Sequence, residues 1–380
     1  MVLSEMILLI LSRRPNSTSE LRGNSVDGAR GGGYKQPQRV PRKRRKVYTM
    51  IKHLLLGGVL LSALAVSAPA QYDGWAHAGA LWILTTPEGA DLPATAAETN
   101  FPLLVRLNQG NFDFAQAKAS GADIRFSAEG KPLAFQIEEW DAARGVASIW
   151  VRIPAIKGNA RQEIKLHWGK ADAASASSGQ AVFNATNGYV SVMHLGEATD
   201  PLLDEVGTIF PTNAGTTVCR GMIGQGRSFT AGTGVFCGKN ITTFPAGASP
   251  HSTEFWARPL VGHRRIIMWG GRPPLSSVQV LMSGVPYRFQ TWTEGSGGGN
   301  VNGSNTVALA QWHHVAFTYR DGEPRLYVNG VLDAAARGRN PMALTNPLAM
   351  YLGAEWGSFA YCFKGDLDEV RVSRVTRSAD

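Results

Sequence analysis

The stretch Arg325-Leu-Tyr-Val-Asn-Gly-Val-Leu332 predicts two short strands joined by a tight turn. Asn329 and Gly330 both tolerate the positive φ angles of a type I′ turn, which matches the twist of paired strands. Just before them, Trp312-His-His-Val-Ala-Phe-Thr-Tyr319 is rich in the β-branched and aromatic residues that favour strands. These segments predict antiparallel β-structure.

The same pattern extends outward over most of the chain. From Asn100 onward, apolar and polar residues alternate in short runs that end at Gly, Pro or Asp, and no helical period stands out. An Ala/Ser-rich stretch at 171–180 resembles a linker. We therefore expect an all-β protein with two antiparallel β-sandwiches, a small one at 98–170 and a larger one of jelly-roll size at 183–380.

The net charge of +9 is confined to the beginning of the chain. Of the 38 Lys and Arg and the 29 Asp and Glu, 12 and 3 respectively lie in residues 1–52, so residues 71–380 are electrically balanced. A basic surface spread over the folded part would have indicated nucleic acid or an anionic membrane as the partner. The balanced charge argues against a nucleic-acid partner.

Residues 50–70 have the pattern of a secretory signal peptide. Lys52 and His53 precede an apolar run, and Ala68-Pro69-Ala70 follows as a small-residue cleavage site. We expect cleavage after Ala70 and export to the periplasm or the extracellular space; an uncleaved anchor is the alternative. Residues 1–49 have too few apolar residues for a core, and we expect a disordered basic leader that results from a misplaced start or forms a long basic region before the signal.

Four segments of the larger sandwich resemble a known family. They are Phe255-Trp-Ala-Arg-Pro259, Trp312–Tyr319, Arg325–Leu332 and Phe363-Lys-Gly-Asp-Leu-Asp-Glu-Val-Arg-Val372. In their order they resemble the laminin-G-like jelly rolls of the concanavalin A-like lectin/glucanase superfamily. The resemblance implies a concanavalin A-like jelly roll at 183–380.

The smaller sandwich also carries a resemblance. Phe-Pro-Leu-Leu-Val at 101, Gly-Ala-Asp-Ile-Arg-Phe at 121 and Ile-Trp-Val-Arg-Ile-Pro at 149 are similar to a bacterial domain of unknown function. That domain often precedes a laminin-G-like jelly roll and then an ExbB/TolQ-type proton-channel module. The resemblance implies, as an alternative function, an accessory or sensor role beside such a membrane complex.

The acidic residues of the last strand are candidates for chemistry. On alternation alone, Asp368 shares the inward face with Val370, whereas Glu369 points outward. An inward carboxylate must accept hydrogen bonds from a neighbouring loop backbone or bind a cation. A calcium site is the second possibility, since hard oxygen ligands from loops suit this ion and relatives of the resembled family bind it at the sandwich rim. The candidate metal ligands are Asp368, Asp200, Asp204 and Glu205.

A glycoside hydrolase or lyase is a further alternative. Two carboxylates at a suitable separation can hydrolyse a glycosidic bond. The glucanases of the superfamily carry acids at alternate positions of one strand, but Val370 stands where the last acid would lie. Because Glu369 is also expected on the opposite face from Asp366 and Asp368, we expect no enzyme.

Exposed aromatic rings are the candidates for ligand binding, because flat rings stack on sugar faces. Trp292 is opposite in phase to its strand neighbours, Trp356 lies in a Gly-rich loop, and Tyr361 is close to it in sequence. Scattered exposed aromatics without a function are equally compatible with this pattern. The histidines show no metal-binding spacing.

Three cysteines lie in the larger sandwich, at 219, 237 and 362. In an exported protein we expect one disulfide among Cys219, Cys237 and Cys362, with the pairing left open and a bond to Cys362 favoured.

The predicted function is therefore that of an exported, non-enzymatic binding module. Its partner would be a carbohydrate or a cell-envelope protein, bound at the rim loops with or without Ca²⁺. The two alternatives are the accessory role beside a membrane proton-channel complex and the glycoside hydrolase or lyase.

Overall fold

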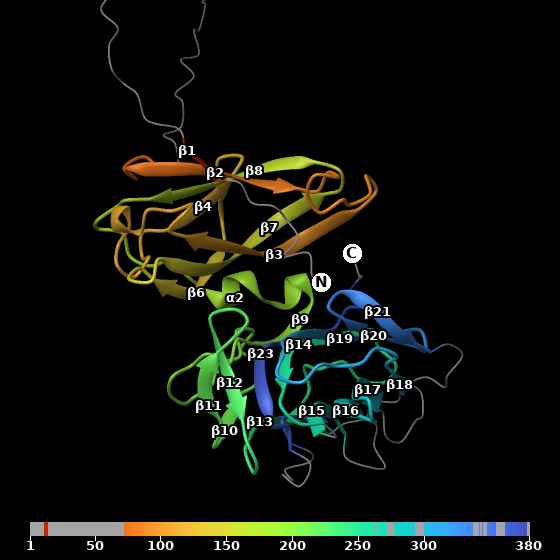
Figure 1. Ribbon diagram of the computed structural model, residues 1–380. Helices are drawn as coiled ribbons and strands as arrows, with labels where there is room; N and C mark the ends of the chain where they lie inside the picture. Colours follow the sequence, from red (N-terminus) through yellow and green to blue (C-terminus); the bar gives the residue numbers. More distant parts are fainter. Residues whose placement is uncertain are drawn as a thin grey trace, which may run out of the picture. The chain divides into compact units, whose positions relative to one another are not determined.

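The computed structural model describes most of the chain after residue 71 (Figure 1). The described residues are 11–13, 72–262, 264–271, 277–292, 300–336, 342, 344, 348–354 and 362–377. The predicted signal peptide at 50–70 lies outside them. Within the part that is described, no helix has the length and apolar character that a membrane crossing requires.

The first sandwich consists of two antiparallel sheets. One sheet has the order β1-β2-β8-β4-β5 and the other the order β3-β7-β6. The first sheet contains β1 (Leu11–Arg13), β2 (His77–Leu84), β8 (Arg161–Trp168), β4 (Arg125–Ala128) and β5 (Lys131–Leu133). The second contains β3 (Ala97–Asn108), β7 (Val146–Lys157) and β6 (Phe135–Asp141).

The first sandwich starts earlier than predicted. Strand β2 pairs along its whole length with β8, so the domain begins about 20 residues before the predicted boundary at 98. Its sequence, His-Ala-Gly-Ala-Leu-Trp-Ile-Leu, begins with small residues and ends with an apolar run, so apolar and polar residues do not alternate along it. Residues 11–13, expected to be disordered, pair with β2 as strand β1.

Alternation in β7 was predicted correctly. Ile149 and Val151 point into the core between the two sheets, whereas Trp150 points to the other face and is equally buried. The predicted linker at 171–180 is not free of the sandwich. The Lys118 ammonium donates to the Ala173 carbonyl oxygen at 3.1 Å, and the Ile137 N–H donates to the Ser177 hydroxyl at 2.8 Å.

The helices that the structure describes are short, and two of the three lie where the two sandwiches are joined along the chain. Helix α2 (Gly179–Val182) begins at Ser178, whose hydroxyl accepts a hydrogen bond from the Ala181 N–H. The 3₁₀-helix η2 (Ala185–Asn187) follows it, and another, η1 (Phe114–Gln116), lies in the first sandwich. Helices α2 and η2 lead the chain directly into β9 (Tyr189–Met193).

The larger sandwich also consists of two antiparallel sheets. Their orders are β10-β13-β22-β15-β16-β17-β18 and β11-β12-β23-β14-β19-β20-β21, and β9 pairs with β23. The first sheet contains β10 (Thr212–Ala214), β13 (Gly234–Ile241), β22 (Leu348–Leu352), β15 (Arg264–Gly270), β16 (Ser277–Ser283), β17 (Arg288–Trp292) and β18 (Val301–Asn302). The second contains β11 (Thr217–Arg220), β12 (Gln225–Phe229), β23 (Gly365–Ser373), β14 (His251–Pro259), β19 (His313–Arg320), β20 (Glu323–Val328) and β21 (Val331–Ala335).

The hairpin that the sequence predicted is present between β20 and β21. Val328 pairs with Val331, and the two turn residues have positive φ angles, 51° at Asn329 and 79° at Gly330. The last strand, β23, lies between β12 and β14 in the middle of its sheet (Figure 1). This central position brings residues far apart in the sequence around β23.

Candidate functional site

Strand β23 contains a β-bulge at Glu369. Arg371 pairs with Glu254 and Asp368 pairs with Trp256, so two residues of β23 lie opposite one residue of β14. Glu369 has a φ of 54°, which is the left-handed conformation that such bulges use. The alternation of side chains is therefore interrupted at this residue.

The bulge corrects the predicted orientation of Asp368. Leu367 and Val370 both lie in the interior of the jelly roll, so Asp368 does not share the face of Val370. Asp368 and Glu369 instead lie on the outer face of the sheet, where they are 0% and 3% exposed. The first sandwich contributes residues to the apolar cluster on this side: Leu104 and Trp150 pack there with Phe183, Tyr189, Val182, Val192 and Ile223.

A second bulge lies at Glu138 in β6 of the first sandwich. Ile137 pairs with Ile149 and Glu139 pairs with Ser148, which leaves Glu138 as the additional residue. Bulges redirect single side chains, and they are enriched next to functional sites. Here two bulges on different strands direct two carboxyl groups to the same place.

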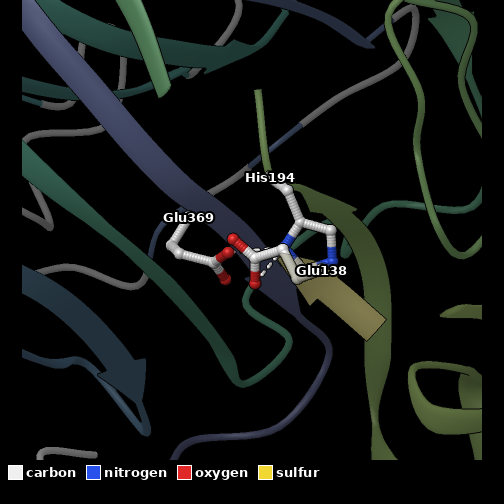
Figure 2. A group of neighbouring side chains, drawn as sticks. All are labelled: Glu138, His194 and Glu369. Carbon is white, nitrogen blue, oxygen red and sulfur yellow. Dashed lines mark hydrogen bonds and ion pairs between the residues drawn. The ribbon is translucent and has the colours of Figure 1, made fainter. Parts of the chain in front are cut away.

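The carboxyl groups of Glu138 and Glu369 meet at the imidazole of His194, just after β9 (Figure 2). His194 Nδ1 is hydrogen-bonded to Glu369 Oε1 and lies 3.5 Å from Glu138 Oε2. The ligand atoms of the three side chains all lie within 4.8 Å of one another. We call these three residues the His–carboxylate cluster.

The other nitrogen of His194 is held by a chain of polar side chains. Nε2 lies 3.1 Å from Gln136 Oε1, and the Gln136 amide donates to Glu205 Oε1 at 2.8 Å. In this arrangement Nε2–H donates to Gln136, which turns Nδ1 toward the two carboxyl groups. The ring therefore has one defined orientation.

Arg371 supplies the nearest permanent positive charge. Its guanidinium donates two hydrogen bonds to Glu369 Oε2 and lies 4.4 Å from the centre of the Trp150 ring. Burial alone would raise the pKa of Glu369, but His194 and Arg371 outweigh it and lower the pKa to about 2. Glu369 is therefore a carboxylate.

The two other acids of this region behave in the opposite way. Burial, and then the charge of Glu369, raises the pKa of Asp368 well above its ordinary value. Burial, followed by the charges of Glu369 and Asp368, likewise raises the pKa of Glu138. Burial disfavours the imidazolium of His194, but Glu369 outweighs it and raises the pKa of His194.

Two buried carboxyl oxygens of this region have no hydrogen-bond partner among the residues that the structure describes. They are Glu138 Oε1 and Asp368 Oδ1. The second oxygen of each group is bonded, since Glu138 Oε2 accepts from the Trp150 indole at 2.5 Å and Asp368 Oδ2 accepts from the Ile223 N–H at 2.8 Å. An unpaired buried polar atom is costly, and it requires an explanation.

A cleft of about 440 Å³ leads from solvent to the cluster. Glu138 and His194 lie in its wall, and β6 and the segment after β9 form most of its border. Its remaining lining residues are Gln136, Ile137, Glu139, Trp140, Asp141, Arg144, Gly196, Glu197, Ala198, Leu203, Glu205 and Gln225.

The predicted calcium ligands are not gathered into one group. The four backbone and hydroxyl donors of Val192, Thr208 and Ile209 occupy both carboxylate oxygens of Asp204. Asp200 is exposed, and Glu205 lies in the cleft, 3.9 Å from His194 Nε2. For Asp368 the hydrogen bond from the Ile223 backbone matches the other possibility that the sequence left open.

The predicted aromatic site is described only in part. Trp292 ends β17, is 43% exposed, and has the Arg265 guanidinium 5.4 Å from its ring centre. Trp356 and Tyr361 lie outside the described residues. Cys219, Cys237 and Cys362 are all free thiols in the structure, so it does not contain the predicted disulfide.

The acids considered for glycoside hydrolysis are buried. The bulge places Asp366, Asp368 and Glu369 on one face, so the expectation that Glu369 lies opposite the others is wrong. Asp366 is 2% exposed, and its carboxylate accepts a hydrogen bond from Arg258 Nε at 2.6 Å. A polysaccharide has no direct access to these three groups.

Sequence reasoning did not find Glu138 or His194. His194 lies 175 residues from Glu369 and 58 residues from Gln136, so no local spacing indicates the cluster. The bulge at Glu138 interrupts the strand period, and the acidic run Glu138-Glu139 has the appearance of a solvated edge.

Comparisons with known proteins agree with this architecture. Residues 232–380 match the concanavalin A-like lectin/glucanases superfamily, and residues 120–191 match a domain of unknown function (DUF2341). Both resemblances drawn from the sequence are thereby confirmed, whereas the link to ExbB/TolQ-type modules stays a prediction. Among curated proteins, none matches.

The solved structures that the chain is similar to are distant in sequence. Domain 4 of AbnA, a GH43 extracellular arabinanase from Geobacillus stearothermophilus in complex with arabinotriose, is 18% identical, with 50% of this chain and 95% of that chain covered and a TM-score of 0.41. The binding domain of Paraclostridial Mosquitocidal Protein 1 is 10% identical, with 51% and 50% covered and a TM-score of 0.39. The native heptameric SAP-like pentraxin from Limulus polyphemus is 15% identical, with 37% of this chain and 70% of that chain covered and a TM-score of 0.30. The superfamily match and the sheet topology together establish an all-β chain with a concanavalin A-like jelly roll.

Proposed function

We propose that this chain is an exported, non-enzymatic binding protein whose ligand is a carbohydrate, held in the cleft beside β6. The observation that carries the proposal is the lining of that cleft, which combines an aromatic ring, Trp140, with carboxylate and amide groups. Sugar recognition uses this combination, since hydroxyl groups donate to fixed acceptors and the apolar sugar face packs on a ring.

The charge of the lining narrows the class of carbohydrate. Five acidic side chains line the cleft, whereas Arg144 is the one Arg or Lys in its lining, and Arg220 outside the lining also pairs with Glu139. Arg144 is already bonded to Asp141 at 2.6 Å and to Glu139 at 3.1 Å. The proposed ligand is therefore a neutral or amino-sugar oligosaccharide, because an anionic glycan would be repelled.

The non-enzymatic part of the proposal is supported by the burial of the acids. Glu138 and Glu369 have ligand atoms within 4.8 Å of one another, and their side chains are only 6% and 3% exposed. Glycoside hydrolysis needs its two carboxyl groups on either side of the scissile bond. A cell-envelope protein as the ligand, and the accessory role beside a proton-channel complex, are separate hypotheses that co-purification would test.

A glycan array with the full chain, followed by calorimetry with the best oligosaccharide, tests the proposal. Gln225 lines the cleft and is exposed. We expect Gln225→Ala to weaken binding by about tenfold, the loss of one hydrogen bond. Trp292→Ala is the matched control, because this exposed ring lies outside the cleft lining, and its binding should be unchanged. Loss of binding in Trp292→Ala alone would instead place the ligand at the rim loops.

A further inference from the structure

The His–carboxylate cluster has the composition of a metal site. Its three members come from three separate parts of the chain: Glu138 from β6, His194 from the segment after β9, and Glu369 from β23. In both glutamates a β-bulge turns the carboxyl group toward the imidazole (Figure 2). Such convergence is unnecessary for packing, since apolar side chains would fill the same volume at lower cost.

The buried carboxyl group of Glu138 is incompletely hydrogen-bonded. The Glu138 side chain is 6% exposed, and its carboxyl group faces Glu369 and His194 (Figure 2). Among the described residues, Glu138 Oε1 has no hydrogen-bond donor. A buried carboxyl group with an oxygen that lacks a donor is costly, and a cation bound by Oε2, the oxygen 3.5 Å from His194 Nδ1, would stabilise the buried group.

The surroundings of His194 have the form expected around a metal-binding histidine. Metal-bound imidazoles donate the N–H of their other nitrogen to an acceptor that fixes the ring. Here Nε2 lies 3.1 Å from Gln136 Oε1, and Gln136 is itself anchored to Glu205 at 2.8 Å. Nδ1 is thereby directed at the oxygens of Glu138 and Glu369.

We propose that Glu138, His194 and Glu369 bind a divalent transition-metal ion, with Zn²⁺ as the ion that fits the donor set best. One imidazole nitrogen and two carboxylate oxygens are ligands that Zn²⁺ uses at about 2.0–2.2 Å. Calcium takes six to eight oxygen ligands, and an imidazole is not among its usual partners. The site therefore differs in both position and ion from the calcium site that the sequence suggested.

The cleft supplies a route for the ion, because Glu138 and His194 form part of its wall. The ion joins a strand of the first sandwich to the central strand of the jelly roll. Ligand binding to the folded state alone raises stability. Bound Zn²⁺ would therefore stabilise the contact between the first sandwich and the jelly roll.

Calorimetry with the full chain tests this proposal, using chelator-treated protein and Zn²⁺ alone as the probe. We expect one Zn²⁺ per chain and a rise in the melting temperature on addition of Zn²⁺, but no rise with Ca²⁺. Glu138→Gln should weaken Zn²⁺ binding by about 100-fold, and Gln136→Leu, which removes the support of the imidazole, by about tenfold.

A second buried histidine–glutamate pair provides the matched control. His314 Nε2 lies 3.6 Å from Glu254 Oε2, and these side chains are 8% and 6% exposed. His314→Gln should bind Zn²⁺ like the wild-type protein. Folding of each variant is checked by melting in EDTA, and His194→Gln replaces Glu138→Gln if the latter does not fold. Absence of Zn²⁺ binding, or equal binding in the cluster variant, would overturn the proposal.

Discussion

The two faces of β23 are both buried, but different interactions hold them. On the inner face, Leu367 and Val370 pack into the jelly-roll interior, where each buried aliphatic side chain contributes roughly 1.5–3 kcal/mol. On the outer face, Glu369 and Arg371 are buried as ions that depend on each other and on His194. The inner face supplies non-directional stability, whereas the outer face is stable only while its partners are in place.

Removing one charge of the outer face should have the largest effect on stability. Arg371→Met keeps the aliphatic stem but leaves Glu369 without one of its two charged partners. Breaking a buried ion pair in this way costs about 3–5 kcal/mol, and we expect that loss in the free energy of unfolding measured with urea.

The control for this variant is an exposed arginine of the same sheet. Arg320 is 68% exposed and contacts only the exposed Asp321 among the interactions described for it. Arg320→Met should change the stability by less than about 0.5 kcal/mol. Equal small effects in both variants would remove the distinction between the two faces of β23.

Acidification should weaken the jelly-roll interior through His251. This imidazole is enclosed by Trp269, Phe317 and Tyr319. Burial lowers the pKa of His251 to about 4, so it stays neutral in the folded protein, whereas the unfolded chain takes up the proton near pH 6.5. The contribution of the neutral His251 to the free energy of unfolding is complete above pH 6.5. As the pH falls from 6.5 to 4, that free energy decreases by about 3 kcal/mol.

Urea titrations from pH 7 to pH 4 would measure this loss. His251→Gln should show a shallower decrease over the same interval, because its side chain does not titrate. A wild-type curve parallel to that of the variant would show that His251 is not held neutral by the interior.

Reduction of the cysteines should have the smallest effect on stability. Burial raises the pKa of Cys219 to about 12 and raises that of Cys237 as well, so neither thiol forms a reactive thiolate at neutral pH. We expect intact-mass measurement to find three free thiols and reductant to leave the melting temperature unchanged. A mass lower by two protons, regained on reduction, would demonstrate a disulfide.

Regular strands were predictable from the sequence because alternation is a local signal. The type I′ turn at Asn329-Gly330, the inward set that includes Ile149 and Val151, and the jelly roll at the end of the chain were all predicted correctly. Strand β2 was missed because its Ala and Gly residues carry little hydrophobic contrast.

The site was not predictable from local patterns. A bulge shifts the phase of every side chain after it, and neither Glu138 nor Glu369 has a neighbouring Gly or Pro that would reveal one. The burial of Asp368 and Glu369 on the outer face also depends on tertiary contacts, which the sequence of β23 alone does not contain.

On the outer face of β23, Glu369 is proposed to bind a metal ion together with Glu138 and His194. Anomalous diffraction at the zinc edge, from crystals of the full chain grown with Zn²⁺, tests it most directly. We expect one strong peak within bonding distance of His194 Nδ1, Glu138 and Glu369. Zinc present elsewhere in the crystal, but no peak among these three side chains, would show that the His–carboxylate cluster does not bind the ion.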